Sequence, residues 1–205
     1  QGESVRVVID GTVGGVNDAC FLPETQQTPS LADVLSGLDA SLPDWFALKI
    51  DVKSAYKRIK LEQSEWRRAM FCISGSWYFY KVLPFGLKAS GYWWNRFNSL
   101  VHRCLHSLLA DIPHGGFVYV DDSLWLVKKV FFPRVFARIL LFLMLIGVPL
   151  AWDKTQLGHV VDWVGFCVDF QARRVFLSEN KRTKLRESMQ EMMSCKCIHF
   201  SVLQA

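Results

Sequence analysis

The sequence lacks any apolar run long enough to cross a membrane. Its most apolar stretch, residues 139–152, is 14 residues long and is interrupted by Gly147 and Pro149, whereas a membrane span needs about 20 residues. We therefore expect a buried helix there, followed by the segment in which the chain leaves the helix. The sequence also shows no signal peptide, internal repeat or low-complexity segment, so we expect an intracellular protein that is not secreted and has no membrane partner.

The sequence also has no cysteine pattern typical of a disulfide framework or a zinc site. Its six cysteines are scattered through apolar stretches, which favours reduced, buried thiols. Cys195, Cys197 and His199 stand close together, but no second half with metal-ligand spacing stands elsewhere. We interpret this cluster as structural.

Neither sign of charge dominates strongly. Lys and Arg number 24 and Asp and Glu 19 in 205 residues, for a formal net charge of +5, with 51% hydrophobic residues. This balance excludes a disordered or fibrous chain and permits a polyanionic partner without requiring one. The chain opens on Gln1 rather than Met and closes on an unfinished helical pattern, so we expect a piece of a longer protein.

The order of strand-like and helix-like patterns predicts an α+β fold with a partly antiparallel sheet. Ser30 is a candidate cap for the first helix and Ser178 for the last. We expect strands at residues 4–10, 46–50, 68–74, 76–82, 117–120, 123–127, 163–166 and 174–177, and helices at residues 30–38, 88–109, 131–146 and 178–193. We expect hairpins between strands 68–74 and 76–82, between 117–120 and 123–127, and between 163–166 and 174–177.

Three acidic residues stand where apolar strands are expected to end. Asp51 ends one strand, and Asp121 and Asp122 occupy the turn of a hairpin. A lone Asp at such a place is usually a cap or a turn residue. Two adjacent carboxylates in a tight turn repel each other unless a cation neutralises them, and turns of this kind prefer Asn-Gly or Asp-Gly. Together these carboxylates would form an oxygen-rich site suited to Mg²⁺ and to two-metal phosphoryl transfer.

Several segments, in order and over nearly the whole chain, resemble the motifs of a reverse transcriptase of the retrotransposon type. The matching segments are Arg6-Val-Val-Ile-Asp10, Asp51-Val-Lys-Ser-Ala-Tyr56, Leu83-Pro-Phe-Gly-Leu87 with Ala89-Ser90, Tyr119-Val-Asp-Asp122, Gly147-Val-Pro-Leu150 with Lys154, and Trp163-Val-Gly-Phe166. A Tyr-x-Asp-Asp sequence alone is weak support, but the ordered set is specific.

The resemblance implies a metal site and a proton donor. Asp51 and Asp121 would bind two Mg²⁺ ions, with Mn²⁺ as a substitute, and the Val52 carbonyl would add a ligand. Asp122 would tune and orient the pair. Lys154 would protonate the departing pyrophosphate as a general acid, although a lone Lys after an apolar helix is as readily explained as a solvated side chain.

The resemblance also implies contacts to nucleotide and nucleic acid. Arg6 would bind the triphosphate, Tyr56 would exclude a 2′-hydroxyl, and Phe85 and Gly86 would lie beside the nucleotide and template. Phe85 stands where many members of the family have Gln, which favours a retrotransposon enzyme. The basic group of Lys53, Lys57, Arg58, Lys60, Arg67 and Arg68 lies where template phosphates would pass, though it could be only a solvated face. Lys57 and Arg58, together with Trp163 and Gly165 of the primer-grip segment, complete the implied nucleic-acid contacts.

The fold that the resemblance implies is a right-hand polymerase palm, a mixed or antiparallel sheet packed on helices, with a fingers subdomain. Fingers would comprise residues 1–43 and 59–89, palm 44–58 and 90–177, and the start of a thumb 178–205. The implied function is RNA-directed DNA polymerisation from deoxynucleoside triphosphates on a primer paired to an RNA or DNA template. A decayed fragment that at most binds nucleic acid is the alternative, and Tyr56 argues against an RNA-templated RNA polymerase.

Overall fold

The computed structural model describes residues 8–36 and 44–194. Several sequence-based expectations lie outside these residues. They are the role of Arg6, residues 4–7 of the first expected strand, the end of the first helix, the cluster of Cys195, Cys197 and His199, and the last part of the expected thumb. Residues 8–10 are described and are not a strand, so the expected strand at 4–10 is wrong at that end.

A four-stranded antiparallel sheet forms the centre of the molecule, in the order β4-β5-β1-β6. Its strands are β1 (Trp45–Asp51), β4 (His114–Tyr119), β5 (Asp122–Lys128) and β6 (Gln156–Gly158). Strand β4 begins three residues before the expected limit, because His114, Gly115 and Gly116 also pair with β5. Strand β5 is one residue longer than expected at each end. The site-bearing strand β1 lies inside the sheet, paired with β5 on one side and β6 on the other.

Both faces of this sheet are covered, which is why its strands read as nearly continuous apolar runs. Alternate side chains of a strand point to opposite faces. Accordingly, Trp125 and Val127 of β5 join one buried cluster and Leu124 and Leu126 join the other.

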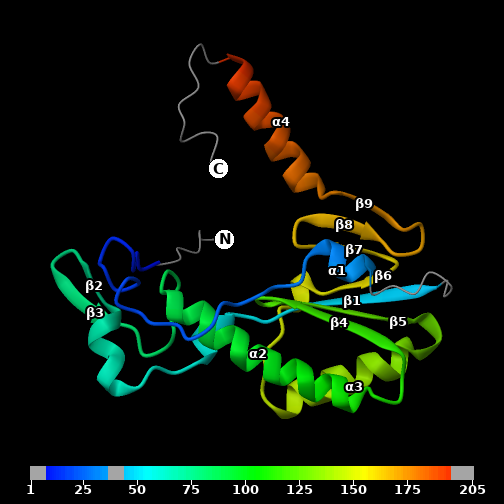
Figure 1. The fold of residues 1–205 in the computed structure, drawn as a ribbon, viewed down its shortest axis with the longest axis horizontal. Coiled ribbons are helices and arrows are strands. Elements are labelled where there is room, and N and C mark those ends of the chain that lie inside the picture. The colour runs from blue at the N-terminus through cyan, green and yellow to red at the C-terminus, as the bar shows by residue number, and fades with distance from the viewer. Residues whose placement is uncertain (1–7, 37–43, 195–205) are drawn as a thin grey trace.

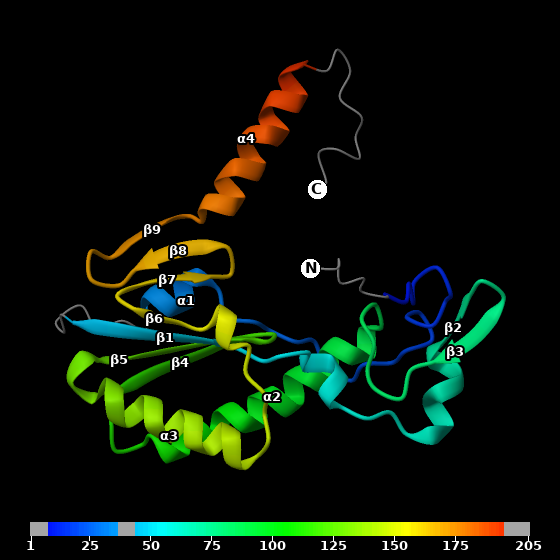
Figure 2. The same ribbon diagram turned by 180° about the vertical axis from the view of Figure 1, so that it is seen from behind.

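Two long helices, α2 (Lys88–Leu108) and α3 (Phe132–Leu145), cover one face of the sheet, as Figures 1 and 2 show. Both lie within one or two residues of the helices expected from sequence. A short helix, α1 (Leu31–Ser36), lies toward the opposite face, where Val34 is buried. Ser30 caps α1 as expected: its Oγ accepts the Asp33 N–H at 3.3 Å, and Asp33 Oδ2 accepts the Ser30 N–H at 2.7 Å.

A second, three-stranded sheet lies on that opposite face. It consists of β7 (Val160–Trp163), β8 (Phe166–Asp169) and β9 (Arg174–Leu177), in that order. The expected hairpin between residues 163–166 and 174–177 is therefore wrong. Residues 163–166 enclose a turn, and β9 pairs with β8 instead, because Val164 and Gly165 both take positive φ and reverse the chain there.

The expected fingers segment carries a separate hairpin of β2 (Met70–Ile73) and β3 (Ser76–Phe79). Its turn is Ser74-Gly75, both at positive φ, as a tight hairpin turn requires. Helix α4 (Glu179–Ser194) extends away from the sheets and buries none of its residues. Short 3₁₀ turns occupy Ala55–Arg58 (η1), Gln63–Ala69 (η2), Lys129–Phe131 (η3) and Trp152–Lys154 (η4).

The structure confirms the predicted α+β class with antiparallel sheets packed on helices. It corrects the expectation of buried thiols: the described cysteines are free as predicted, but Cys72 and Cys104 are exposed. No helix within the described residues is long and apolar enough to span a membrane. The boundaries between fingers, palm and thumb stay predictions.

Candidate active site

The end of β1 and the β4–β5 turn bring the three predicted carboxylates to one edge of the central sheet. Asp51, the last residue of β1, pairs in register with Asp122, the first residue of β5. The Val52 N–H donates to the Asp121 carbonyl at 3.2 Å. This backbone bond links Asp121, the last residue of the turn, to the residue that follows β1, so the acidic positions are held by backbone pairing.

Burial and repulsion by neighbouring carboxylates disfavour ionisation of Asp121 and Asp122. The pKa of Asp121 is raised, first by burial and then by the Asp51 charge. The pKa of Asp122 is also raised by burial, an effect that the Lys49 charge opposes and the charges of Asp51 and Asp121 reinforce. A bound cation would relieve both effects.

Two lysines balance part of the negative charge of these carboxylates. Lys154 Nζ donates to Asp51 Oδ2 at 3.1 Å, and the pKa of Lys154 is raised mainly by this hydrogen bond. Lys49 Nζ lies 3.5 Å from Asp122 Oδ1, an oxygen that is buried and makes no hydrogen bond. Lys49 was missed at the sequence level, although a charged residue two positions before Asp51 in an apolar strand was a usable signal.

The donor atoms fit an oxygen-liganded divalent cation in type and in charge. Among the described residues, however, no group of three or more His, Cys, Asp or Glu side chains is arranged to hold a metal ion. In this arrangement Lys49 and Lys154 neutralise the carboxylates. Lys154 would have to leave Asp51 before a metal ion could bind there. Metal ligation by Asp51, Val52, Asp121 and Asp122 therefore stays a prediction.

Tyr56, on η1, lies beside this edge. Its ring contacts that of Phe85 with centroids 4.9 Å apart. The pKa of Tyr56 is raised by burial and then by the Asp121 charge, which places the phenol within electrostatic reach of the carboxylates. The half-buried ring of Tyr56 packs on Phe85, and its contact with a nucleotide sugar stays a prediction.

Glycine at position 86 is required by a contact within the chain, and its predicted place beside the nucleotide and template stays a prediction. Gly86 has φ +95°, and a Cβ there would lie 1.6 Å from the Ile9 carbonyl oxygen. The close approach is thus to the chain's own backbone, where the Ile9 N–H also bonds the Phe85 carbonyl at 3.1 Å. Asn17 completes this junction, accepting the Lys88 N–H at 2.8 Å and donating to the Gly86 carbonyl at 3.0 Å. No local signal marked Asn17, because its partners lie about 70 residues away.

The structure corrects the expected role of the Trp163 ring. This side chain is only 1% exposed and packs in the core between the two sheets, so the ring cannot reach a primer in this arrangement. Gly165 has φ +78° and lies against the Lys181 side chain at the base of α4. A primer contact in this segment would therefore be made by the backbone of the β7–β8 turn.

Lys57 and Arg58 are exposed on η1, as a phosphate contact requires. Arg58 Nε donates to the Lys53 carbonyl at 3.1 Å, which fixes its side chain beside the same turn. A contact of Lys57 and Arg58 with nucleic acid stays a prediction.

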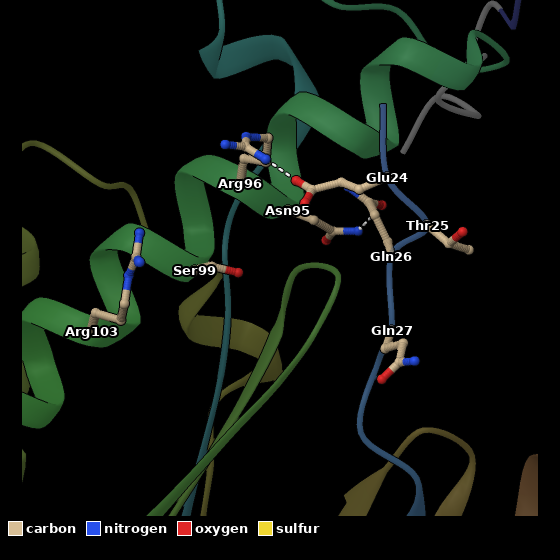
Figure 3. A pocket seen from close by; sticks show the side chains of 8 residues that line it. All are labelled: Glu24, Thr25, Gln26, Gln27, Asn95, Arg96, Ser99 and Arg103. Atoms are coloured by element: carbon tan, nitrogen blue, oxygen red, sulfur yellow. Dashed lines mark hydrogen bonds and ion pairs between the residues drawn. The ribbon is translucent and has the colours of Figure 1, made fainter. Parts of the chain in front are cut away.

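A polar groove that sequence reasoning missed runs between residues 24–27 and α2 (Figure 3). Asn95 Nδ2 donates to Gln26 Oε1 at 2.6 Å, Gln26 Nε2 donates to the Tyr92 carbonyl at 2.8 Å, and Arg96 pairs with Glu24. These bonds hold an otherwise irregular segment along the helix. The residues lining the groove are Glu24, Thr25, Gln26, Gln27, Asn95, Arg96, Ser99 and Arg103.

Comparison with known proteins defines the family. The sequence model of the family described as reverse transcriptase (RNA-dependent DNA polymerase) matches residues 12–173. The chain therefore belongs to the reverse transcriptase family, and the predicted resemblance to a retrotransposon-type member is confirmed. It is 29% identical over 102 residues to the retrovirus-related Pol polyprotein from transposon gypsy of Drosophila melanogaster, a match that covers 49% of this chain and 9% of that protein.

Solved structures show the same fold. A foamy viral protease-reverse transcriptase in complex with double-stranded DNA matches with a TM-score of 0.69 and 21% identity, over 97% of this chain and 32% of that one. The foamy viral protease-reverse transcriptase in complex with an RNA/DNA hybrid matches with a TM-score of 0.60 and 19% identity, over 78% of this chain and 20% of that one. The chain thus spans a third or less of the length of these relatives.

Proposed function

We propose that this chain is the fingers and palm part of an RNA-directed DNA polymerase. The observation that supports this most is the meeting of Asp51 with Asp121 and Asp122 at one sheet edge, in a chain of the reverse transcriptase family. The partners would be a primer paired to an RNA or DNA template, and deoxynucleoside triphosphates. The foamy viral complexes with DNA and with an RNA/DNA hybrid favour the first of these partners.

In this proposal each residue of the site has a separate role. Asp51, Asp121 and the Val52 carbonyl would hold two Mg²⁺ ions, which supply an activated primer hydroxyl and charge stabilisation at the phosphate. Asp122, paired with Lys49, would hold the turn in place. Tyr56 would lie against the sugar of the incoming nucleotide, with Phe85 behind it.

Lys154 has two roles in the proposal. It neutralises Asp51 before the substrate arrives, and it would donate a proton to pyrophosphate afterwards. Phosphate contacts to the template would come from Lys57 and Arg58, which are not among the proposed metal ligands. Binding and chemistry should therefore be separable.

The test replaces one carboxylate at a time in the full-length protein. Asp51→Asn and Asp121→Asn should lower primer extension by roughly 10³-fold or more while primer-template affinity changes little. Asp153→Asn, at an exposed carboxylate outside this group, is the matched control and should extend normally. Extension by either variant at the wild-type rate would contradict the assignment. Binding without extension by the wild type would favour the decayed fragment.

A further inference from the structure

The turn that carries Asp121 has an unfavourable backbone conformation. Val120 and Asp121 form the two-residue turn between the paired residues Tyr119 and Asp122. Val120 has φ +56°, in the left-handed region that suits glycine. A β-branched side chain there is a steric outlier. Some other contact must hold the turn in this form.

Helix α2 supplies that contact. The Val120 carbonyl accepts a hydrogen bond from Trp94 Nε1 at 2.8 Å and another from Asn98 Nδ2 at 2.9 Å. Trp94 and Asn98 are one helical turn apart, so their side chains share a face of α2. They are 1% and 4% exposed, which means that both donors act without competition from water.

The same turn is held from the other side. The Asp121 carbonyl accepts the Val52 N–H at 3.2 Å. The peptide groups that follow Val120 and Asp121 are thus fixed by α2 and by the end of β1, respectively. The orientation of the Asp121 side chain depends on both.

We propose that Trp94 and Asn98 are positioning residues for Asp121. By fixing the carbonyl of Val120, they hold this residue at positive φ and keep the Asp121 carboxylate directed at the edge that Asp51 shares. Without the two donors, Val120 would relax toward negative φ and the carboxylate would turn away. This inference rests on the proposed function only in that one of its tests measures polymerase activity.

A comparison within the molecule shows that the Trp94 bond is not a general need of buried tryptophans. Trp45, Trp125 and Trp163 are also buried, and the structure gives their indole nitrogens no hydrogen-bond partner. A buried indole in this fold is therefore tolerated without a bond. Trp125→Phe is consequently a matched control, because it changes a buried ring but removes no hydrogen bond.

The first experiment removes the donors from the full-length polymerase. Trp94→Phe keeps a ring and loses the N–H, and Asn98→Ala loses the amide. Each should lower the rate of primer extension at saturating substrate by about tenfold and the pair by more, with KM for the nucleotide and affinity for primer-template little changed. Trp125→Phe should stay near the wild-type rate. An equal loss in Trp94→Phe and Trp125→Phe would overturn the proposal.

The second experiment uses rescue at the turn. Val120→Gly, placed in the Trp94→Phe, Asn98→Ala background, should restore most of the lost rate, because glycine adopts positive φ without a Cβ penalty. It should also restore most of the lost melting temperature, and this second readout needs no catalysis. A well-folded triple variant that recovers neither quantity would overturn the proposal. If the wild type fails to extend a primer, the proposed function fails, while recovery of the melting temperature still supports the positioning role.

Discussion

Lys154 Nζ and Asp51 Oδ2 are 3.1 Å apart, although the two residues come from segments far apart in the sequence. The lysine therefore occupies one of the two Asp51 oxygens that the proposal assigns to a metal ion. Replacing Lys154 by Met should have opposite effects on two measurements. It should slow primer extension by about tenfold or more through loss of the proposed proton donor, and it should lower the Mg²⁺ concentration required for half-maximal rate, because a competing cation is gone.

Lys154→Arg is the control for that substitution. Arg keeps the positive charge but is not deprotonated at ordinary pH. Its Mg²⁺ requirement should stay near that of the wild type while its rate falls. A Met variant that needs more Mg²⁺ than the wild type would refute competition between the lysine and the ion.

Tyr56 should discriminate between sugars. Its ring packs on Phe85 and lies within reach of the Asp121 charge. Tyr56→Ala would remove the ring that, in the proposal, excludes a 2′-hydroxyl. Incorporation of ribonucleotides relative to deoxynucleotides should rise by at least about tenfold, or roughly 1.4 kcal/mol.

Single-nucleotide extension with each sugar type gives the kcat/KM ratio for this comparison. Tyr56→Phe keeps the ring and loses only the hydroxyl, so its ratio should match the wild type. An unchanged ratio in Tyr56→Ala, together with a large loss of stability, would identify the tyrosine as a core residue.

His102 should make the stability of the fold depend on pH. It is buried on α2, where its ring stacks on Trp125 and its Nε2 lies 2.8 Å from Ser123 Oγ. Burial, and then the neighbouring His106, lower its pKa from 6.5 to about 4. The unfolded chain therefore binds a proton at a higher pH than the folded one, and stability is lost as pH falls from about 6.5 toward 4.

The loss attributable to this one group should total about 3 kcal/mol. Urea unfolding of the wild type between pH 7 and pH 4 measures it. His102→Phe should show a much flatter dependence, whereas Ser123→Ala, which removes the hydrogen-bond partner but keeps the imidazole, should retain the slope. A wild-type slope in His102→Phe would assign the pH dependence to other groups.

Gly86→Ala should be more damaging than an ordinary glycine substitution at positive φ. The new Cβ would strike the Ile9 carbonyl and would also be strained at φ +95°. Gly75 has φ +79° but nothing within 4 Å of its Cβ position, so Gly75→Ala carries the conformational cost alone. We expect about 1 kcal/mol for Gly75→Ala and about 3 kcal/mol or more for Gly86→Ala in the free energy of unfolding. Equal losses would mean that the segment at Ile9 yields easily.

The carboxylates could be predicted from sequence because their signal is local. Asp51 ends an apolar strand, and Asp121 and Asp122 interrupt an apolar hairpin where glycine would be expected. Because apolar strands can pair in few ways, the positions of these carboxylates at strand ends also predict that they meet at one end of the central sheet.

What the sequence did not predict depends on contacts between distant segments. Asn17 bonds to Lys88 and Gly86, and the burial of Trp163 depends on how the second sheet packs against the first. The pairing of β9 with β8 depended on the turn at Val164 and Gly165, where a valine at positive φ gave no compositional signal.

The interior place of β1 in the central sheet has a consequence for how the molecule opens. Asp51 lies on a strand with partners on both sides, whereas β2 and β3 pair only with each other. Amide protons of β1 should therefore exchange with solvent last and those of the β2–β3 hairpin much earlier. The segment that carries the central carboxylate would persist while the expected fingers segment unfolds and refolds around it.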